Sequence, residues 1–373
     1  LHSFPTRRSS DLFRLACRVS AKRLFPNFSF IDAPFNLQYY DPKDHNTEVA
    51  YMGCRTRVVA NNYDPGRQTT SGRGNLSFTS VNLPRIAIKA KGDLDIFFED
   101  LDRKISLVVD QLLDRFKIQA AKKVKNYPFL MGQGIWLDSE KLGPNDEVGE
   151  VLKHGTLTIG FIGLAECLKA LIGTHHGESE EAQNLGLDII GYMRKRVDDA
   201  CKKTGLNFSL IATPAEGLSG RFVKIDREKY GDISNVTDKG YYTNSYHVDV
   251  REKIDAFTKF KIESEFQNKS LGGAISYVEV PNLTNNVEAI EEVIRFIYDN
   301  IQYGEFNTKS DYCHVCGYDG EIMINDNMEW ECPQCHNKDH AKMNVTRRTC
   351  GYLGENFWNA GKTKEIKARV LHL

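Results

Sequence analysis

The stretch Gly155-Thr-Leu-Thr-Ile-Gly-Phe-Ile-Gly-Leu164 is almost wholly apolar, and it runs directly into a helix-forming segment at residues 165–171. A short apolar run of this kind predicts a buried strand that feeds a helix. Strands that alternate with helices along a chain imply an α/β fold. The spacing of apolar residues elsewhere predicts four further elements: a helix over 93–123, a helix over 179–204, a strand over 208–212 and a helix over 287–300.

The composition is typical of a soluble intracellular protein. Charged residues make up 27% of the 373 residues, the mean hydropathy is −0.44 and the formal net charge is −1. Because no apolar run reaches the length of a membrane span, we expect a cytoplasmic protein with no membrane partner. The near-zero charge offers no broad basic surface, which disfavours a nucleic-acid partner.

The first twelve residues, Leu1-His-Ser-Phe-Pro-Thr-Arg-Arg-Ser-Ser-Asp-Leu12, do not continue this pattern. They lack the apolar region of a signal peptide, and no initiating Met precedes them. We interpret residues 1–12 as non-native sequence fused to a truncated reading frame. A short native tail is the alternative.

Four cysteines near the end of the chain have the spacing of a metal site. Cys313-x-x-Cys316 and Cys332-x-x-Cys335 are separated by fifteen residues, which is typical of a tetrahedral four-cysteine zinc site. The linker predicts a short hairpin, and so small a ribbon needs the metal to fold. Four thiolates leave no position for a water, so we expect a structural rather than a catalytic zinc. Residues 306–340 are assigned to this zinc ribbon.

The segment Arg348-Thr-Cys-Gly-Tyr-Leu-Gly354 follows the ribbon. Taken alone, Gly351 in this segment is typical of an ordinary turn glycine. Together with the ribbon and the short remaining tail, however, the segment resembles the C-terminal end of the oxygen-sensitive, glycyl-radical class of ribonucleoside-triphosphate reductases. The resemblance implies that residues 341–373 form a glycyl-radical loop and tail, and that Gly351 carries the stored radical.

The same resemblance extends upstream to about Phe25. The segment Tyr51-Met-Gly-Cys-Arg-Thr-Arg57 stands where the family places its transient thiyl radical, which implies that role for Cys54. Asn75 stands where the family uses an asparagine to hydrogen-bond the ribose, and its amide offers both donors and an acceptor. The alternatives from the residues themselves are a buried packing cysteine and a turn-capping asparagine.

Thr213-Pro-Ala-Glu-Gly217 follows the strand predicted over 208–212. A strand that runs into small residues at the start of a helix exposes backbone N–H groups, and such an end binds anions. We therefore expect Thr213, Ala215 and Gly217 to line the pocket for the substrate triphosphate, in keeping with a similar phosphate loop elsewhere in the reductase superfamily. Glu216 is interpreted as a first-turn carboxylate.

The resemblance implies a fold and a reaction. Residues 13–305 would form the C-terminal part of a ten-stranded α/β barrel of the glycyl-radical enzyme type, to which the zinc ribbon and the radical loop are attached. The reaction would reduce ribonucleoside triphosphates to deoxyribonucleoside triphosphates under anaerobic conditions. A separate iron–sulfur activase using S-adenosylmethionine would generate the radical, and the full-length protein would be a homodimer.

The chain would lack the upstream strands and the allosteric region, so we expect it to be inactive alone. Another glycyl-radical enzyme and a non-catalytic zinc-ribbon protein that binds nucleic acid are the alternatives.

Three further segments have structural interpretations. His175-His176 is expected to lie in a solvated loop rather than to form a metal pair. Tyr241-Tyr-Thr-Asn-Ser-Tyr-His-Val248 is expected to form a strand, with His247 a core or rim histidine rather than a general base. Cys167 and Cys201 fall on predicted helices and are expected to be packing residues. His314 and His336 flank zinc thiolates and are alternative ligands.

Overall fold

The computed structural model describes residues 7–53, 55–349, 352–355 and 358–373. None of the helices in these ranges combines the length and apolar character needed to cross a membrane. The α-helices are α1 (Arg7–Lys22), α2 (Pro34–Leu37), α3 (Leu83–Ala90), α4 (Leu94–Ala120), α5 (Gly149–Leu152), α6 (Leu164–Ile172), α7 (Glu180–Thr204), α8 (Gly217–Tyr230), α9 (Ala256–Gln267), α10 (Val287–Asn300) and α11 (Ala360–Ala368).

The five longer strands of the main body are parallel. They are joined by helices, which is the pattern that an α/β fold requires. A short antiparallel hairpin and five parallel strands make up this part: β1 (Ala50–Met52), β2 (Thr56–Val58), β3 (Asn75–Asn82), β4 (Thr156–Ile162), β5 (Asn207–Ala212), β6 (Ser276–Val280) and β7 (Gly304–Thr308).

The parallel strands follow one another in chain order. Strands β3, β4 and β5 form one sheet, and β6 pairs with β7. An isolated parallel bridge between Ile211 and Gly273 connects the end of β5 to the segment that leads into β6. The predicted α/β class is therefore confirmed, and the helices and strands expected from residue 93 to residue 300 lie within a few residues of their predicted bounds.

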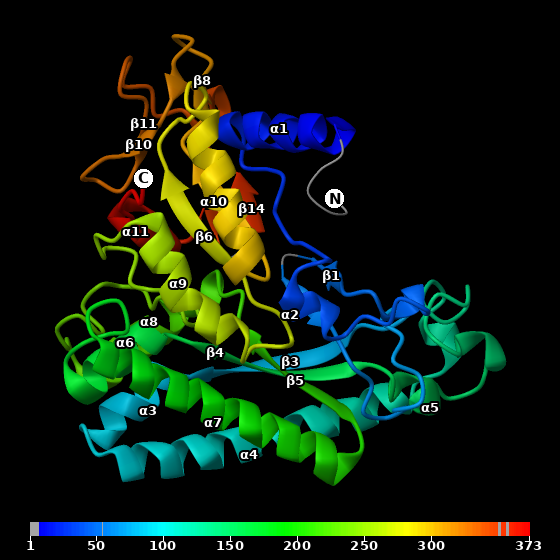
Figure 1. The fold of residues 1–373 in the computed structure, drawn as a ribbon. Helices are drawn as coiled ribbons and strands as arrows, with labels where there is room; N and C mark the ends of the chain where they lie inside the picture. Colours follow the sequence, from blue (N-terminus) through cyan, green and yellow to red (C-terminus); the bar gives the residue numbers. More distant parts are fainter. Residues whose placement is uncertain (1–6, 54, 350–351, 356–357) are drawn as a thin grey trace.

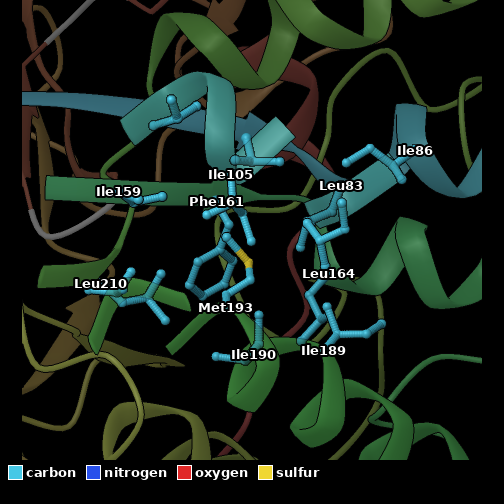
Figure 2. Packing of buried hydrophobic residues seen from close by; sticks show 14 of the residues in the cluster. Leu83, Ile86, Ile105, Ile159, Phe161, Leu164, Ile189, Ile190, Met193 and Leu210 are labelled. Atoms are coloured by element: carbon cyan, nitrogen blue, oxygen red, sulfur yellow. The ribbon is translucent and has the colours of Figure 1, made fainter. Parts of the chain in front are cut away.

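The largest core lies between the three-stranded sheet and the helices α3, α4, α6 and α7, which cover one of its faces (Figure 1). Figure 2 shows its centre, where Phe161 and Ile159 of β4 and Leu210 of β5 contact Met193 and Ile190 of α7. Strand β4 is buried along its whole length, which explains why its sequence is a continuous apolar run. Cys167 and Cys201 are buried in this core, so their predicted packing role is confirmed.

A second core joins the N-terminal helix to the later part of the chain. Cys17 and Ala21 of α1 lie in one apolar cluster with residues of α9, α10, β6 and β7. Helix α1 begins at Arg7 and therefore crosses the boundary expected at residue 12. The interpretation of residues 1–12 as non-native sequence stays a prediction.

The C-terminal region is built from short antiparallel strands next to α11. These strands are β8 (Asp311–Cys313), β9 (Asp319–Gly320), β10 (Met323–Ile324), β11 (Trp330–Glu331), β12 (Met343–Asn344), β13 (Thr346–Thr349) and β14 (Tyr352–Glu355). Strands β10 and β11 form the hairpin predicted between the cysteine pairs. This region lies at the top of the view in Figure 1, away from α4 and α7.

Two structural predictions are wrong. The segment 241–248 is irregular rather than a strand, because its backbone groups bond to buried side chains from elsewhere: Thr243 N–H donates to Glu166 and Val248 N–H to Glu263. The pair His175-His176 lies in a loop, but both residues are only 2% exposed. His176 Nε2 lies 2.7 Å from the carbonyl oxygen of Tyr246, so this loop is held against the irregular segment instead of facing solvent.

Candidate active site

The four cysteines of the ribbon converge as their spacing predicts. All four Sγ atoms lie within 4.8 Å of one another, and Cys313–Cys335 and Cys316–Cys332 are each separated by 3.7 Å. A tetrahedral zinc ion with Zn–S bonds of about 2.3 Å separates its thiolates by about 3.8 Å, so the donor set fits this metal.

Backbone hydrogen bonds preorganise both cysteine pairs. Gly317 N–H donates to Cys313 O and His336 N–H to Cys332 O, each at 2.9 Å, which closes the two tight turns. His336 Nδ1 lies 2.7 Å from Glu331 Oε1, and the metal-binding group that the described part of the ribbon forms consists of the four cysteines. The geometry therefore favours a closed four-thiolate site over one that uses a flanking histidine.

Strand β13 carries the residues that precede Gly351; Cys350 and Gly351 themselves lie outside the described residues. Arg347 is 1% exposed and binds both carboxylate oxygens of Asp311, with Nη2 at 2.7 Å from Oδ2. Its Nη2 also donates to the carbonyl oxygen of Ile322. Because Asp311 begins the ribbon strand β8, this pair attaches the segment before Gly351 to the zinc ribbon.

The next residue, Arg348, binds the main body instead. Its Nη1 donates to Glu305 Oε1 of β7 at 2.9 Å, and its backbone N–H donates to Asn307 Oδ1 at 3.1 Å. Burial raises the pKa of Glu305 to about 7, whereas the charges of Arg348 and Arg55 act in the opposite direction. A carboxyl group whose pKa is displaced in this way indicates a candidate functional position.

The hairpin β1–β2 reaches the same region from the other side. Cys54 lies between these strands in the sequence, but it is outside the described residues. Arg55 is fully buried, and its Nη1 donates to the carbonyl oxygen of Ala212 at the end of β5 (3.1 Å). In β1, Tyr51 stacks on Tyr303 with 4.8 Å between ring centroids. The hairpin therefore packs against the end of β5 and against Tyr303, the residue before β7.

The turn after β5 lies at the same strand ends. Thr213 is fully buried and its Oγ1 lies 2.8 Å from Ser80 Oγ of β3, while Ala215 N–H donates to Asn244 Oδ1. Helix α8 begins at Gly217, so the predicted strand–turn–helix arrangement is confirmed. Thr349 of β13 donates from Oγ1 to Glu216 Oε1 at 3.3 Å, which brings the segment before Gly351 against this turn.

Asn75 lies at the opposite end of the sheet. It pairs in register with Thr156, which pairs with Asn207, six residues before Thr213. Asn75 and Thr213 are therefore about 20 Å apart along the strands. Asn75 Oδ1 accepts a hydrogen bond from Thr158 Oγ1 at 2.9 Å. Its neighbour Gly74 approaches the hairpin, since a Cβ added there would lie 3.5 Å from Met52 Sδ.

The structure thus brings Arg55, Thr213 and Thr349 to one end of the sheet and places Asn75 at the other. The sequence reasoning missed Glu305 and Ser80, which contact this region. A signal for Glu305 exists in Gly304-Glu-Phe-Asn-Thr308, where buried polar residues alternate with apolar or small ones, but their partner Arg348 is distant in sequence.

Solved structures with the same fold define the class of protein. An anaerobic ribonucleotide reductase superposes with a TM-score of 0.68 at 19% identity, over 100% of this chain and 54% of its own. The anaerobic ribonucleotide reductase from Thermotoga maritima with glycerol in the active site gives 0.62 at 18% identity, over 96% of this chain and 51% of its own. The fold is that of anaerobic ribonucleotide reductases.

The sequence comparisons then show the family. A family model described as anaerobic ribonucleoside-triphosphate reductase matches residues 2–372. The proteins of that name from Escherichia coli K12 and Enterobacteria phage T4 are 36% and 35% identical over 369 and 371 residues, in each case 97% of this chain. The chain belongs to the anaerobic ribonucleoside-triphosphate reductase family, which confirms the resemblance. It spans about half the length of these relatives, 50% and 58% respectively.

Proposed function

We propose that the chain provides the C-terminal part of the catalytic unit that reduces ribonucleoside triphosphates to deoxyribonucleoside triphosphates by radical chemistry. One observation carries this proposal: the segments next to Cys54 and Gly351 both contact the ends of the parallel strands, through Arg55 on Ala212 and Thr349 on Glu216. In the proposed reaction the radical passes from Gly351 to Cys54. Cys54 then abstracts the 3′ hydrogen of the ribose, which starts loss of the 2′-hydroxyl as water. A reductant, either formate or a dithiol system, would supply the two electrons.

Thr213, Ala215 and Gly217 are proposed to hold the substrate triphosphate. Their turn opens the 14-residue helix α8, whose N-terminal amides favour an anion. Because Ala215 N–H already donates to Asn244, we expect the amides from Gly217 onward to face the phosphates. Asn75 is proposed to bind the ribose through its NH₂ group, since its Oδ1 is already engaged by Thr158. The hairpin β1–β2 approaches both Asn75 and the turn after β5, so the substrate would lie along this hairpin.

The cysteines Cys313, Cys316, Cys332 and Cys335 are proposed to hold a structural zinc ion. Bound zinc supplies the folding free energy that so small a ribbon lacks, and the thiolates close the coordination shell against water. The pairing of Arg347 with Asp311 supports a role in placing the radical segment.

The wider assembly is also part of the proposal. The five parallel strands support the later part of a ten-stranded barrel at 13–305, with the ribbon at 306–340 and the radical loop and tail at 341–373. A radical-SAM activase would generate the Gly351 radical, and the full-length protein would act as a cytoplasmic homodimer.

Another glycyl-radical enzyme is the second candidate. A structure for 1,2-propanediol dehydration in Roseburia inulinivorans superposes with a TM-score of 0.56 at 12% identity, over 96% of this chain. That likeness concerns the fold alone, and the family match favours the reductase.

Electron paramagnetic resonance tests the proposed function. The full-length protein, activated anaerobically by its activase, is expected to give a doublet from a Cα radical with one attached hydrogen, and Gly351→Ala is expected to abolish it. Cys54→Ser should keep the doublet but lose ribonucleotide reduction, because it removes only the later step. A doublet that survives in Gly351→Ala, or reduction that survives in Cys54→Ser, would contradict the assignment.

A further inference from the structure

Strand β7 and the residue before it, Tyr303, present three alternate side chains to the two segments that lead to Cys54 and Gly351. The apolar residue Phe306 of β7 packs with α9 and α10, whereas Tyr303, Glu305 and Asn307 point to the other side. Tyr303 stacks on Tyr51 of the hairpin at 4.8 Å, and Asn307 Oδ1 accepts from the backbone N–H of Arg348. One face of β7 thus contacts the arm that leads to Cys54 and the strand that leads to Gly351.

Glu305 is the central member of this face, and it is fully buried. Its Oε1 accepts from Arg348 Nη1 at 2.9 Å, and Arg348 is itself only 3% exposed. The positive charge of Arg55, the residue directly after Cys54, also acts on this carboxylate. Within the described part of the chain, its Oε2 is buried without a hydrogen-bond partner.

We propose that Glu305 is a positioning residue for radical transfer, which fixes Arg348 and thereby holds β13, the strand that leads to Gly351, against β7. This inference rests on the proposed function. The physical reason is that loss of the carboxylate leaves the guanidinium buried without a counter-charge, although its Nη2 still donates to the carbonyl oxygen of Leu24. A buried charge without its ion-pair partner strongly favours movement of Arg348 away from β7. Gln at this position retains an oxygen that accepts from Arg348, whereas Ala does not.

The ratio of substrate turnover to radical content separates positioning from general stability. We would prepare the full-length protein with its activase and measure bound zinc, the electron paramagnetic resonance doublet and ribonucleotide reduction for Glu305→Ala, Glu305→Gln and Asp100→Asn. Asp100 of α4 is a matched control, since it is 4% exposed and paired with Lys89 of α3, away from the segments that lead to Cys54 and Gly351.

In Glu305→Ala we expect turnover per radical to fall at least about tenfold, because Arg348 no longer holds β13 against β7. Glu305→Gln should recover most of this loss, and Asp100→Asn should leave the ratio unchanged. Unchanged turnover per radical in Glu305→Ala would overturn the proposal, as would an equal loss in all three variants.

If Glu305→Ala does not fold, the double variant Glu305→Leu/Arg348→Met removes both charges and keeps the volume. It should bind zinc and form the radical, yet show the same tenfold or larger loss of turnover per radical. Normal turnover in the double variant would overturn the positioning role. Absence of the doublet in the wild-type protein would instead contradict the proposed function itself.

Discussion

Gly160→Ala is predicted to destabilise the protein, although alanine is otherwise better than glycine in a strand. Gly160 lies in the middle of β4, and a Cβ added there would lie 2.0 Å from Thr213 Oγ1 and 2.9 Å from Ser80 Oγ. The Thr213 hydroxyl must therefore move, which breaks its 2.8 Å hydrogen bond to Ser80. Overpacking costs about 1–3 kcal/mol and the lost bond about 1 kcal/mol, against a gain of about 0.5–1 kcal/mol for removing a glycine.

A net loss of about 1–3 kcal/mol in the free energy of unfolding follows, measured by urea denaturation. Gly191→Ala is the matched control, because it lies in α7 with only Lys269 Nζ near, at 3.6 Å, and should stabilise the protein by up to about 1 kcal/mol. Adding Thr213→Ala to Gly160→Ala removes the clashing hydroxyl and should recover at least about 1 kcal/mol. Strictly additive effects of these two substitutions would refute the reasoning.

Two further predictions concern the metal and the protonation of buried histidines. Cys332→Ala should abolish zinc binding, as measured by metal analysis. The variant should loosen the ribbon but retain the circular dichroism of the α/β body. Full retention of zinc would contradict a four-thiolate site. Burial lowers the pKa of His176 to about 3 and that of His247 to about 4. As the pH falls below about 6.5, these two imidazoles therefore take up a proton in the unfolded chain before they do so in the folded protein. Protonation of the unfolded chain lowers the free energy of unfolding. Between pH 7 and pH 5, each histidine should lower the free energy of unfolding by about 2 kcal/mol. His176→Gln should make the free energy of unfolding depend less steeply on pH. An equally steep pH dependence in that variant would exclude His176 as its source.

The regular elements were predictable because their apolar patterns are local. The continuous run of β4 and the helical spacing in α4 and α7 reflect burial against neighbouring layers, and the structure places them within a few residues of the predicted bounds. Segment 241–248 was predicted wrongly because its aromatic residues are buried, as in a strand, while its backbone groups bond to Glu166 and Glu263. Nothing in the local pattern distinguishes these two ways of satisfying a buried backbone.

The candidate site shows the same division between local and distant information. The CxxC pairs define the ribbon because each turn brings its own two thiols together. By contrast, the distance between Asn75 and Thr213 depends on the register of β3, β4 and β5, which no motif contains. Glu305 was missed because its partner Arg348 lies 43 residues away in sequence.

Two consecutive arginines explain how the ribbon and the main body act on the same segment. Neighbouring side chains in a strand point to opposite faces, so Arg347 of β13 reaches Asp311 of the ribbon while Arg348 reaches Glu305 of β7. Both pairs are buried, and buried ion pairs contribute little net stability compared with apolar residues of the same volume. Their directional hydrogen bonds instead restrict where β13 can lie, since a shift of the strand breaks the bidentate contact of Arg347 with Asp311 and the single hydrogen bond from Arg348 to Glu305. Zinc bound by the ribbon would then act through Asp311 and Arg347 on the position of β13, the strand that leads to Gly351.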